Sequence, residues 1–374
     1  MPKYGFSQAR LCSLHRELLW VGMAFFKRNS SIALNLYRGI YQGLTAALFL
    51  VAALPLAYGQ DTSPPNLSLP IICQPGHDCW LVNYVDTNPG PGIRDYACAK
   101  RSYDGHKGVD LAIRDLREMQ KGVPVVAAVG GIVKAVRDGM ADVDVSIAGI
   151  NSVKGRECGN GMVVTHRGGW ETQYCHLRRG SVAVKAGDAV NRGQRLGLVG
   201  NSGRAQFPHV HLSVRKGKTV IDPFIGVPRS RGCGLGAAPL WSKPALAALK
   251  APSTALFNAG FATGAPDPKV VRSGLLAAKR FPRDAPALVL WVDMYWAEAG
   301  DQLQFRITGP GDKPFAANTI TLTKTQARRL TFIVKKLKAR SWPPGTYRGD
   351  VVLIRKKGRF GPLRLSVTRE VELR

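Results

Sequence analysis

Acidic side chains are scarce in this sequence. Asp and Glu number 25 against 53 Lys and Arg, so the 374 residues carry a formal net charge of +28. Such an imbalance concerns partners and solubility rather than fold. It suggests nucleic acid first and anionic envelope polymers or lipid surfaces second, with a well-solvated basic surface as the alternative. The basic residues are dispersed and no zinc-finger, helix-turn-helix or RNA-binding signature accompanies them, so no specific nucleic-acid partner is predicted.

Three motifs of well-known metal-binding or hydrolytic sites are missing. No two cysteines are spaced as C-x-x-C, which argues against a structural zinc cluster. No H-E-x-x-H occurs, so the helical arrangement of many zinc proteases is absent. No G-x-S-x-G occurs either, which weakens the case for a serine hydrolase.

Glycine and proline, in contrast, are frequent, with 41 and 24 residues. Many turns between short strands would use them. An apolar fraction of 45% allows a sizeable core, and the length suggests two domains with some additional chain. The sequence therefore predicts a mainly β protein.

One uncharged apolar run stands near the N-terminus. It extends from Gly43 to Gly59, ends in small residues and precedes a plausible cleavage site before Gln60. This pattern is typical of a signal peptide and predicts a periplasmic or secreted protein without a stable membrane span. The run has about 17 residues, the lower limit for crossing a membrane, so an uncleaved anchor is the alternative. Residues 1–59 are therefore set apart as an N-terminal extension, with Met23 as a candidate true start.

Six cysteines follow the expected cleavage site, and an even number in an exported chain suggests disulfides. They are Cys73, Cys79, Cys98, Cys158, Cys175 and Cys233. Six cysteines allow 15 pairings. The pairing that we predict is Cys158 with Cys175, which flank an apparent hairpin, although strict hairpin register does not place them directly opposite. The chain after Cys233 has no cysteine, and this change of composition is the clearest domain boundary.

The first globular part is predicted to begin with an irregular, disulfide-tied lead over residues 60–100. Short strand patterns then follow one another over residues 101–233. Two hairpins are expected there, one turning at Gly130–Gly131 and the other at residues 167–170. The pattern predicts an all-β sheet or barrel-like domain.

The second part begins after a segment rich in Ala, Gly, Pro and Ser. This segment, residues 234–285, is predicted to be a linker with some helix. Residues 286–374 contain six or seven short strands, several with alternating polar and apolar side chains. This spacing predicts an immunoglobulin-like β-sandwich, an architecture that does not require cysteine.

Four histidines and one aspartate form the chemically most informative pattern. His209 and His211 are two residues apart in an expected strand, so their side chains share one face. His106 and Asp110 are four apart in a segment whose glycines favour extended chain, where they also share a face. His176 ends another expected strand and adds an imidazole that can orient water or stabilise an oxyanion.

Imidazole nitrogens and carboxylate oxygens are zinc ligands, and three protein ligands leave a fourth position for water, as in catalytic zinc sites. Zinc lowers the pKa of bound water to about 7. Each motif alone is weak, because a lone histidine is more often a surface or core residue. Their occurrence together in one domain favours a metal-dependent hydrolase.

Other candidates carry less weight. His166 is expected at an exposed strand end, and His77 in a turn between two cysteines. Ser202 and Arg204 lie in the loop before Pro208, where they would either touch a substrate or only shape the loop.

Four segments together resemble the lysostaphin-type (LytM-like) zinc metallopeptidases, which are peptidoglycan hydrolases. They read YDGHKGVDLAI, VPVVAAVGGIVKAV, GNGMVVTHRGGWETQYCHL and VKAGDAVNRGQRLGLVGNSGRAQFPHVHLSV, in the order and spacing of that family. The resemblance implies that residues 101–233 fold as a β-sheet peptidase domain with a zinc groove. It implies one Zn²⁺ per chain, held by His106, Asp110 and His211. It further implies that His176 and His209 are the catalytic histidines.

The resemblance implies a zinc-dependent endopeptidase that hydrolyses peptide cross-links of bacterial peptidoglycan, in which zinc-bound water attacks the scissile carbonyl with the help of two histidines. The expected partners are peptidoglycan and, through the basic charge, anionic envelope polymers. The alternative is a non-catalytic wall-binding or amidase-activating protein of the same fold, although no position of the site pattern is missing. The exact bond, the role of the C-terminal domain, autoinhibition and oligomeric state stay open at this stage.

Overall fold

The computed structural model describes residues 62–227, 232–250, 252–276, 278–358 and 361–374. Residues 60–374 form one compact unit. The apolar run from Gly43 to Gly59, for which a signal peptide was predicted, lies outside the described residues. Within the described ranges, none of the helices is long and apolar enough to cross a membrane.

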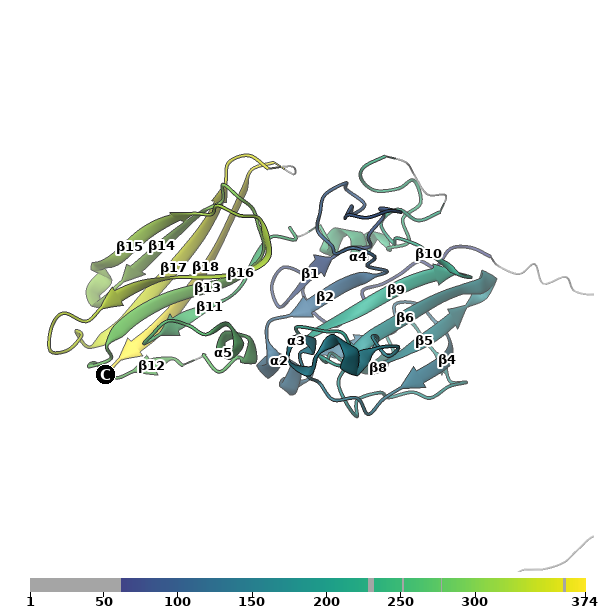
Figure 1. The fold of residues 1–374 in the computed structure, drawn as a ribbon, viewed down its shortest axis with the longest axis horizontal. Coiled ribbons are helices and arrows are strands. Elements are labelled where there is room, and N and C mark those ends of the chain that lie inside the picture. Colours follow the sequence, from purple (N-terminus) through teal and green to yellow (C-terminus); the bar gives the residue numbers. More distant parts are fainter. Residues whose placement is uncertain (1–61, 228–231, 251, 277, 359–360) are drawn as a thin grey trace, which may run out of the picture. The chain divides into compact units, whose positions relative to one another are not determined.

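The protein is mainly β, as the sequence predicted, and its first part is built on one large antiparallel sheet (Figure 1). The strands follow one another across this sheet in the order β1 (Cys79–Asn83), β2 (Val109–Ile113), β9 (His209–Lys216), β6 (Trp170–Leu177), β5 (Asn160–His166), β4 (Gly131–Arg137) and β7 (Ala189–Val190), and β10 (Thr219–Val220) pairs with β9. A two-stranded sheet joins β3 (Pro124–Val126) to β8 (Arg195–Leu198). The short helical elements here are α2 (Leu116–Lys121), α3 (Val145–Ala148), η1 (Ile150–Val153) and η2 (Arg167–Gly169).

Strand β9 is central to this sheet because it pairs with β2 on one side and β6 on the other. Alternate residues of a strand face opposite sides of the sheet. Val210, Leu212 and Val214 are buried and belong to the hydrophobic core. His209 and His211 therefore face the other side, held in place by a strand that is anchored along both edges.

The hairpin expected at Gly130–Gly131 is wrong. Strand β3 pairs with β8, whereas β4 pairs with β5 and β7. The glycines serve a close approach instead of a hairpin turn. A Cβ atom on Gly131 would lie 2.3 Å from the carbonyl oxygen of Thr165 on the neighbouring strand.

The second expected hairpin is confirmed, because β5 and β6 are antiparallel partners joined by η2. The predicted disulfide between Cys158 and Cys175 is also present. Two further disulfides join Cys73 to Cys79 and Cys98 to Cys233. Cys158 lies in the turn before β5, and its carbonyl oxygen accepts a hydrogen bond from the backbone N–H of His176, which brings together two cysteines that strict hairpin counting leaves out of register.

The three disulfides are expected to contribute unequally to stability. The Cys98–Cys233 bond spans 135 residues, and a loop of that length predicts about 5 kcal/mol from the restricted unfolded chain. The Cys73–Cys79 bond spans 6 residues and predicts only about 2 kcal/mol by the same relation. Urea unfolding should thus show a greater loss of unfolding free energy for Cys98→Ala/Cys233→Ala than for the control Cys73→Ala/Cys79→Ala. Equal losses would contradict the loop-length argument.

The C-terminal part contains two sheets with a common core. One has the order β11 (Ala255–Ala262), β13 (Ala287–Ala297) and β16 (Gln326–Lys336). The other has the order β12 (Arg280–Phe281), β18 (Leu363–Leu373), β17 (Gly345–Arg355), β14 (Gln302–Thr308) and β15 (Pro314–Thr321), with η3 (Pro310–Asp312) after β14. Apolar side chains from both sheets form one buried cluster, which includes Leu290, Phe305 and Val351. The immunoglobulin-like assignment of this part stays a prediction.

Residues 234–285, which we expected to be a linker with some helix, contain α4 (Lys243–Ala248), α5 (Pro268–Ser273) and also two strands, β11 and the short β12. Strand β11 is buried along almost its whole length and includes Gly260, packed against the ring of Trp291. A strand covered on both faces loses the alternation of polar and apolar residues that marks a strand in a sequence. Its small residues made it resemble a linker.

An aromatic cluster connects the two parts within the compact unit. Trp80 and Val82 of β1 are buried together with Phe257, Tyr295 and Trp296. The indole N–H of Trp296 donates a hydrogen bond to the carbonyl oxygen of Val82. Strand β1 thus belongs to the large antiparallel sheet and also contacts the C-terminal part.

Candidate metal and hydrolytic site

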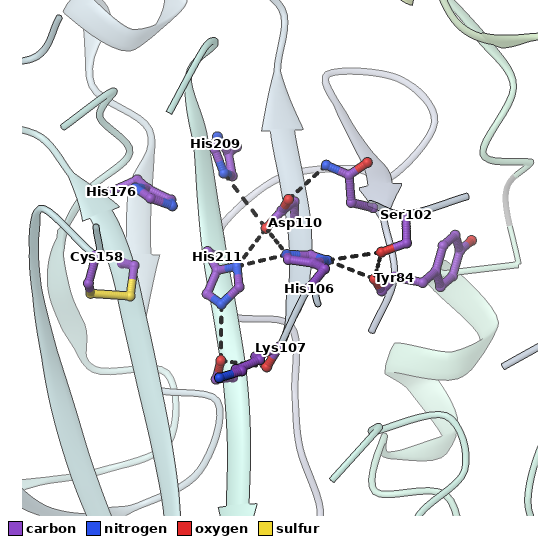
Figure 2. A network of polar contacts seen from close by, with 12 residues as sticks. Tyr84, Ser102, His106, Lys107, Asp110, Cys158, His176, His209 and His211 are labelled. Carbon is purple, nitrogen blue, oxygen red and sulfur yellow. Dashed lines mark hydrogen bonds and ion pairs between the residues drawn. A yellow bond between two sulfur atoms is a disulfide. The ribbon is translucent and has the colours of Figure 1, made fainter. Parts of the chain in front are cut away.

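The five residues singled out in the sequence lie together on one side of the large sheet (Figure 2). Asp110 on β2 is the direct cross-strand partner of His211 on β9. His106 lies in the loop that precedes β2, outside the strand itself. His176 lies on β6, the strand on the other side of β9.

His106, Asp110 and His211 bring three ligand atoms close to one another. The distances are 3.1 Å from Nε2 of His106 to Nδ1 of His211, 3.2 Å from Nε2 of His106 to Oδ1 of Asp110, and 2.8 Å from Nδ1 of His211 to Oδ1 of Asp110. Ligands bound to a tetrahedral zinc are about 3.4 Å from one another, given bond lengths of about 2.1 Å. The three atoms form a slightly smaller triangle, so small outward movements would admit the ion. The chemistry and spacing of these donors fit zinc.

Hydrogen bonds to the other ring nitrogens set the tautomers of the two histidines. His106 donates from Nδ1 to the carbonyl oxygen of Tyr84 at 2.7 Å, which leaves the Nε2 lone pair for a metal. The hydroxyl of Ser213 donates to the carbonyl oxygen of Lys107 at 2.6 Å, so it accepts from Nε2 of His211 at 3.0 Å. The Nδ1 lone pair of His211 is therefore free to bind a metal.

The carboxylate is oriented in the same way. The side-chain amide of Asn83 on β1 donates to Oδ2 of Asp110 at 2.8 Å, while Oδ1 faces His106 and His211. Sequence reasoning missed both Asn83 and Ser213. The only available signal was that Ser213 continues the spacing of His209 and His211 on one face of β9.

His176 and His209 face each other with their ring centroids 4.6 Å apart. Nδ1 of His176 donates to the carbonyl oxygen of Ser202 at 2.7 Å, and Nδ1 of His209 donates to that of Phe207 at 2.8 Å. Each ring therefore keeps a lone pair on Nε2. For His209 this atom lies 3.7 Å from Oδ1 of Asp110, next to the ligand triangle.

The backbone at His176 is unusual for a residue with a side chain, because its φ of 63° lies in the left-handed region. Its N–H donates to the carbonyl oxygen of Cys158, and the disulfide from Cys158 to Cys175 holds the same two segments together. Conformations of this kind persist where the surroundings enforce them, often at functional sites. The disulfide thus supports the placement of the His176 ring.

Burial lowers the pKa of two of these histidines, His176 and His211. It lowers the pKa of His176 well below the ordinary value, and the charges of His209 and His211 lower this pKa further, so His176 is neutral at pH 7. Burial also lowers the pKa of His211. Neutral imidazole is the form that binds a metal or accepts a proton.

The carboxylate is ionised. Burial alone would raise the pKa of Asp110, but the charges of His106 and His209 and a hydrogen bond from His106 bring it well below the usual range. Burial lowers the pKa of His106, yet the charge of Asp110 together with hydrogen bonds to Asp110 and to the carbonyl oxygen of Tyr84 raises it overall. The carboxylate of Asp110 thus favours a positive charge next to it. A bound metal cation would take the place of the proton that the raised pKa of His106 retains.

The remaining candidates do not join the five. Ser202 is fully buried, and its hydroxyl donates to the carbonyl oxygen of Leu177. Its burial supports a role in shaping the loop rather than in contact with a substrate. Arg204 is exposed and lines a cavity that also reaches His209. His166 is half-buried and bonds to Gly130 and Thr172, and His77 is exposed in a turn.

Part of this chain is similar to known peptidases. Residues 104–223 match the model of peptidase family M23. Peptidoglycan DD-endopeptidase ShyA of Vibrio cholerae is 34% identical over 109 residues, which cover 29% of this chain and 20% of that protein. DD-carboxypeptidase/endopeptidase Mpg of Neisseria meningitidis serogroup B is 35% identical over 120 residues, which cover 32% of this chain and 22% of that protein.

Among solved structures, the catalytic domain of the antimicrobial peptidase lysostaphin from Staphylococcus simulans is 22% identical, with a TM-score of 0.25 over 38% of this chain and 85% of that one. The chain spans at most 25% of the length of the curated relatives named above and of the uncharacterized metalloprotease of Buchnera aphidicola. The family match includes all five residues of the site. Residues 104–223 of this chain are accordingly a domain of peptidase family M23.

Proposed function

We propose that this protein is a zinc-dependent endopeptidase that hydrolyses peptide cross-links of peptidoglycan. The observation that carries the proposal is the triangle formed by the ligand atoms of His106, Asp110 and His211, whose edges are 2.8–3.2 Å long. Both histidines have their second nitrogen engaged in a hydrogen bond, so their free lone pairs converge on one point. When bound there, zinc would polarise the scissile carbonyl and make a water molecule acidic.

His176 and His209 are the proposed proton carriers. In the neutral state each has a free lone pair on Nε2, because Nδ1 donates to a backbone carbonyl. Such a ring can accept a proton from the water as its oxygen bonds to the carbonyl carbon. It can then return that proton to the nitrogen of the departing amine as the C–N bond breaks. The water's proton is thus fully accounted for by these two side chains.

Several observations favour a cell-wall substrate outside the cytoplasm. Relatives are named peptidoglycan DD-endopeptidase and DD-carboxypeptidase/endopeptidase. Three disulfides fit an oxidising compartment, such as the periplasm or the exterior. The net charge of +28 would favour adsorption to anionic envelope polymers.

Digestion of purified peptidoglycan by the full chain with zinc tests the proposal. We expect cross-linked muropeptide dimers to become monomers, and mass spectrometry of the products should identify the bond that is cut. If the protein binds zinc stoichiometrically but cuts nothing, a non-catalytic wall-binding or amidase-activating role replaces the proposal. If the folded protein binds no zinc, the metal site itself is refuted.

A further inference from the structure

A cavity of about 670 Å³ adjoins the proposed hydrolytic site. The first part of the chain contributes Asn83, Ser102 and His209 to its lining. Arg272 and Arg328 line it from the C-terminal part of the chain, outside the M23 match. A ligand in this cavity would touch the hydrolytic site and the C-terminal part at the same time.

The lining of this cavity is basic. It includes Arg204, Arg272 and Arg328 but no aspartate or glutamate. Arg328 is only 14% exposed and binds Oδ2 of Asp293 through Nε at 3.1 Å and Nη2 at 2.8 Å. This ion pair fixes the guanidinium and offsets its charge. The charges of Arg204 and Arg272 have no such carboxylate within salt-bridge distance in the described structure.

Two polar groups of this lining lack partners although they are buried. Tyr295 is 2% exposed, and its hydroxyl makes no hydrogen bond to any described residue. Nε of Arg272, in the last turn of α5, is likewise buried without a partner. Unpaired buried donors of this kind are uncommon and cost free energy until a ligand or water satisfies them. Burial and the charge of Arg328 lower the pKa of Arg272, and a bound anion would relieve that repulsion.

The surroundings hold these groups in place. The Tyr295 ring stacks on Phe257 at 4.1 Å, and the guanidinium of Arg328 lies 5.6 Å from the centroid of the Tyr295 ring. Phe207 lies between the two sides of the cavity, with its ring centroid 4.8 Å from that of His209 and 5.9 Å from that of Tyr295. The basic lining is therefore a preformed surface close to His209.

We propose that Arg272, Tyr295 and Arg328 form a subsite that binds a free carboxylate of the peptide substrate next to the scissile bond. The inference rests on the proposed function, because the anion must belong to the molecule that reaches His209. Guanidinium donors and a tyrosine hydroxyl match the planar, acceptor-only chemistry of a carboxylate. A cross-linked peptide offers two sources of this carboxylate, the α-carboxylate at its C-terminus and the carboxylate of the residue whose side-chain amine forms the cross-link.

Steady-state kinetics of the full, zinc-loaded chain on synthetic cross-linked peptides tests this subsite. The peptides contain the bond that the digestion of peptidoglycan identifies and occur in three forms: free acid, amide of the terminal carboxylate and amide of the carboxylate on the cross-linking residue. We expect one of the two amides to raise KM about tenfold at similar kcat, because a charge-assisted hydrogen bond is lost. The form that does so identifies the source of the carboxylate.

The variant Arg272→Gln should raise KM for the free acid about tenfold and should no longer respond to amidation, since partners in one contact are not additive. Tyr295→Phe, which keeps the buried ring, should give a smaller shift in the same direction without loss of thermal stability. Arg306→Gln removes an equal charge from an exposed position on β14 and should change neither constant.

Three outcomes would overturn the inference. Equal KM for all three peptides with the wild-type protein shows that no carboxylate is recognised. If the increases in KM caused by Arg272→Gln and by amidation multiply, Arg272 and the substrate carboxylate do not contact each other. If the wild-type protein cuts none of the peptides and no peptidoglycan, the proposed function fails and the subsite with it. Should Arg272→Gln not fold, the response of Tyr295→Phe to amidation decides the question.

Discussion

His211→Ala is expected to abolish stoichiometric zinc binding and, with it, peptide hydrolysis. The substitution leaves two of three ligands and removes the nitrogen that lies 2.8 Å from Oδ1 of Asp110. Changes to residues that only orient zinc ligands already weaken binding 10- to 100-fold, so loss of a ligand should weaken it by more than about 100-fold. Metal content after dialysis and a competition titration with a chelator give the affinity directly.

The matched control for this experiment is His77→Ala. It removes an imidazole from the same part of the chain, but His77 is exposed in a turn and its ring is outside the ligand triangle. Zinc content should stay at one ion per chain. Unchanged zinc affinity in His211→Ala with a native circular dichroism spectrum would show that the metal, if any, binds elsewhere.

Substitution of His176 or His209 is expected to separate metal binding from turnover. Neither residue belongs to the ligand triangle, so zinc should remain bound. Loss of a side chain that transfers a proton in the transition state lowers kcat by about 10²- to 10⁴-fold with little change in KM. The variants His176→Asn and His209→Gln keep a polar side chain, and asparagine tolerates the left-handed backbone at position 176 better than most residues.

The measurement is kcat and KM on a cross-linked peptide, together with zinc content, for each variant and for their combination. Because the two rings are 4.6 Å apart, we expect the double variant to lose less than the product of the two single losses. A kcat within a factor of about two of the wild type for either variant would remove that histidine from the proposed mechanism. If either variant loses its zinc, the substituted histidine is instead a metal ligand.

The sequence was sufficient to single out the five residues that the structure brings together on one side of the large sheet. His209 and His211 share a strand face because side chains alternate along any strand, and this holds whatever surrounds the strand. The strands of the C-terminal part, such as β17 and β18, were also predictable because their buried and exposed residues alternate. Strand β11 was not, because it is buried on both faces and so carries no alternation.

Which strands pair with one another could be determined only from the tertiary structure. The glycines at positions 130 and 131 gave a local hairpin signal, but only the fold shows that Gly131 packs against the carbonyl oxygen of Thr165. Likewise, six cysteines allowed 15 pairings, and only the distance in space joins Cys98 to Cys233 across 135 residues.

The sequence by itself thus determined which side chains offer zinc-binding and proton-accepting atoms, since these are properties of residue type and of local spacing. The tertiary structure decided how they act together. It places Asn83 on Asp110 and Ser213 on His211, which orients the ligand atoms, and it brings Arg272 and Tyr295 to the cavity beside His209. Contacts between residues far apart in the chain depend on how strands pair and pack, and no local pattern encodes them.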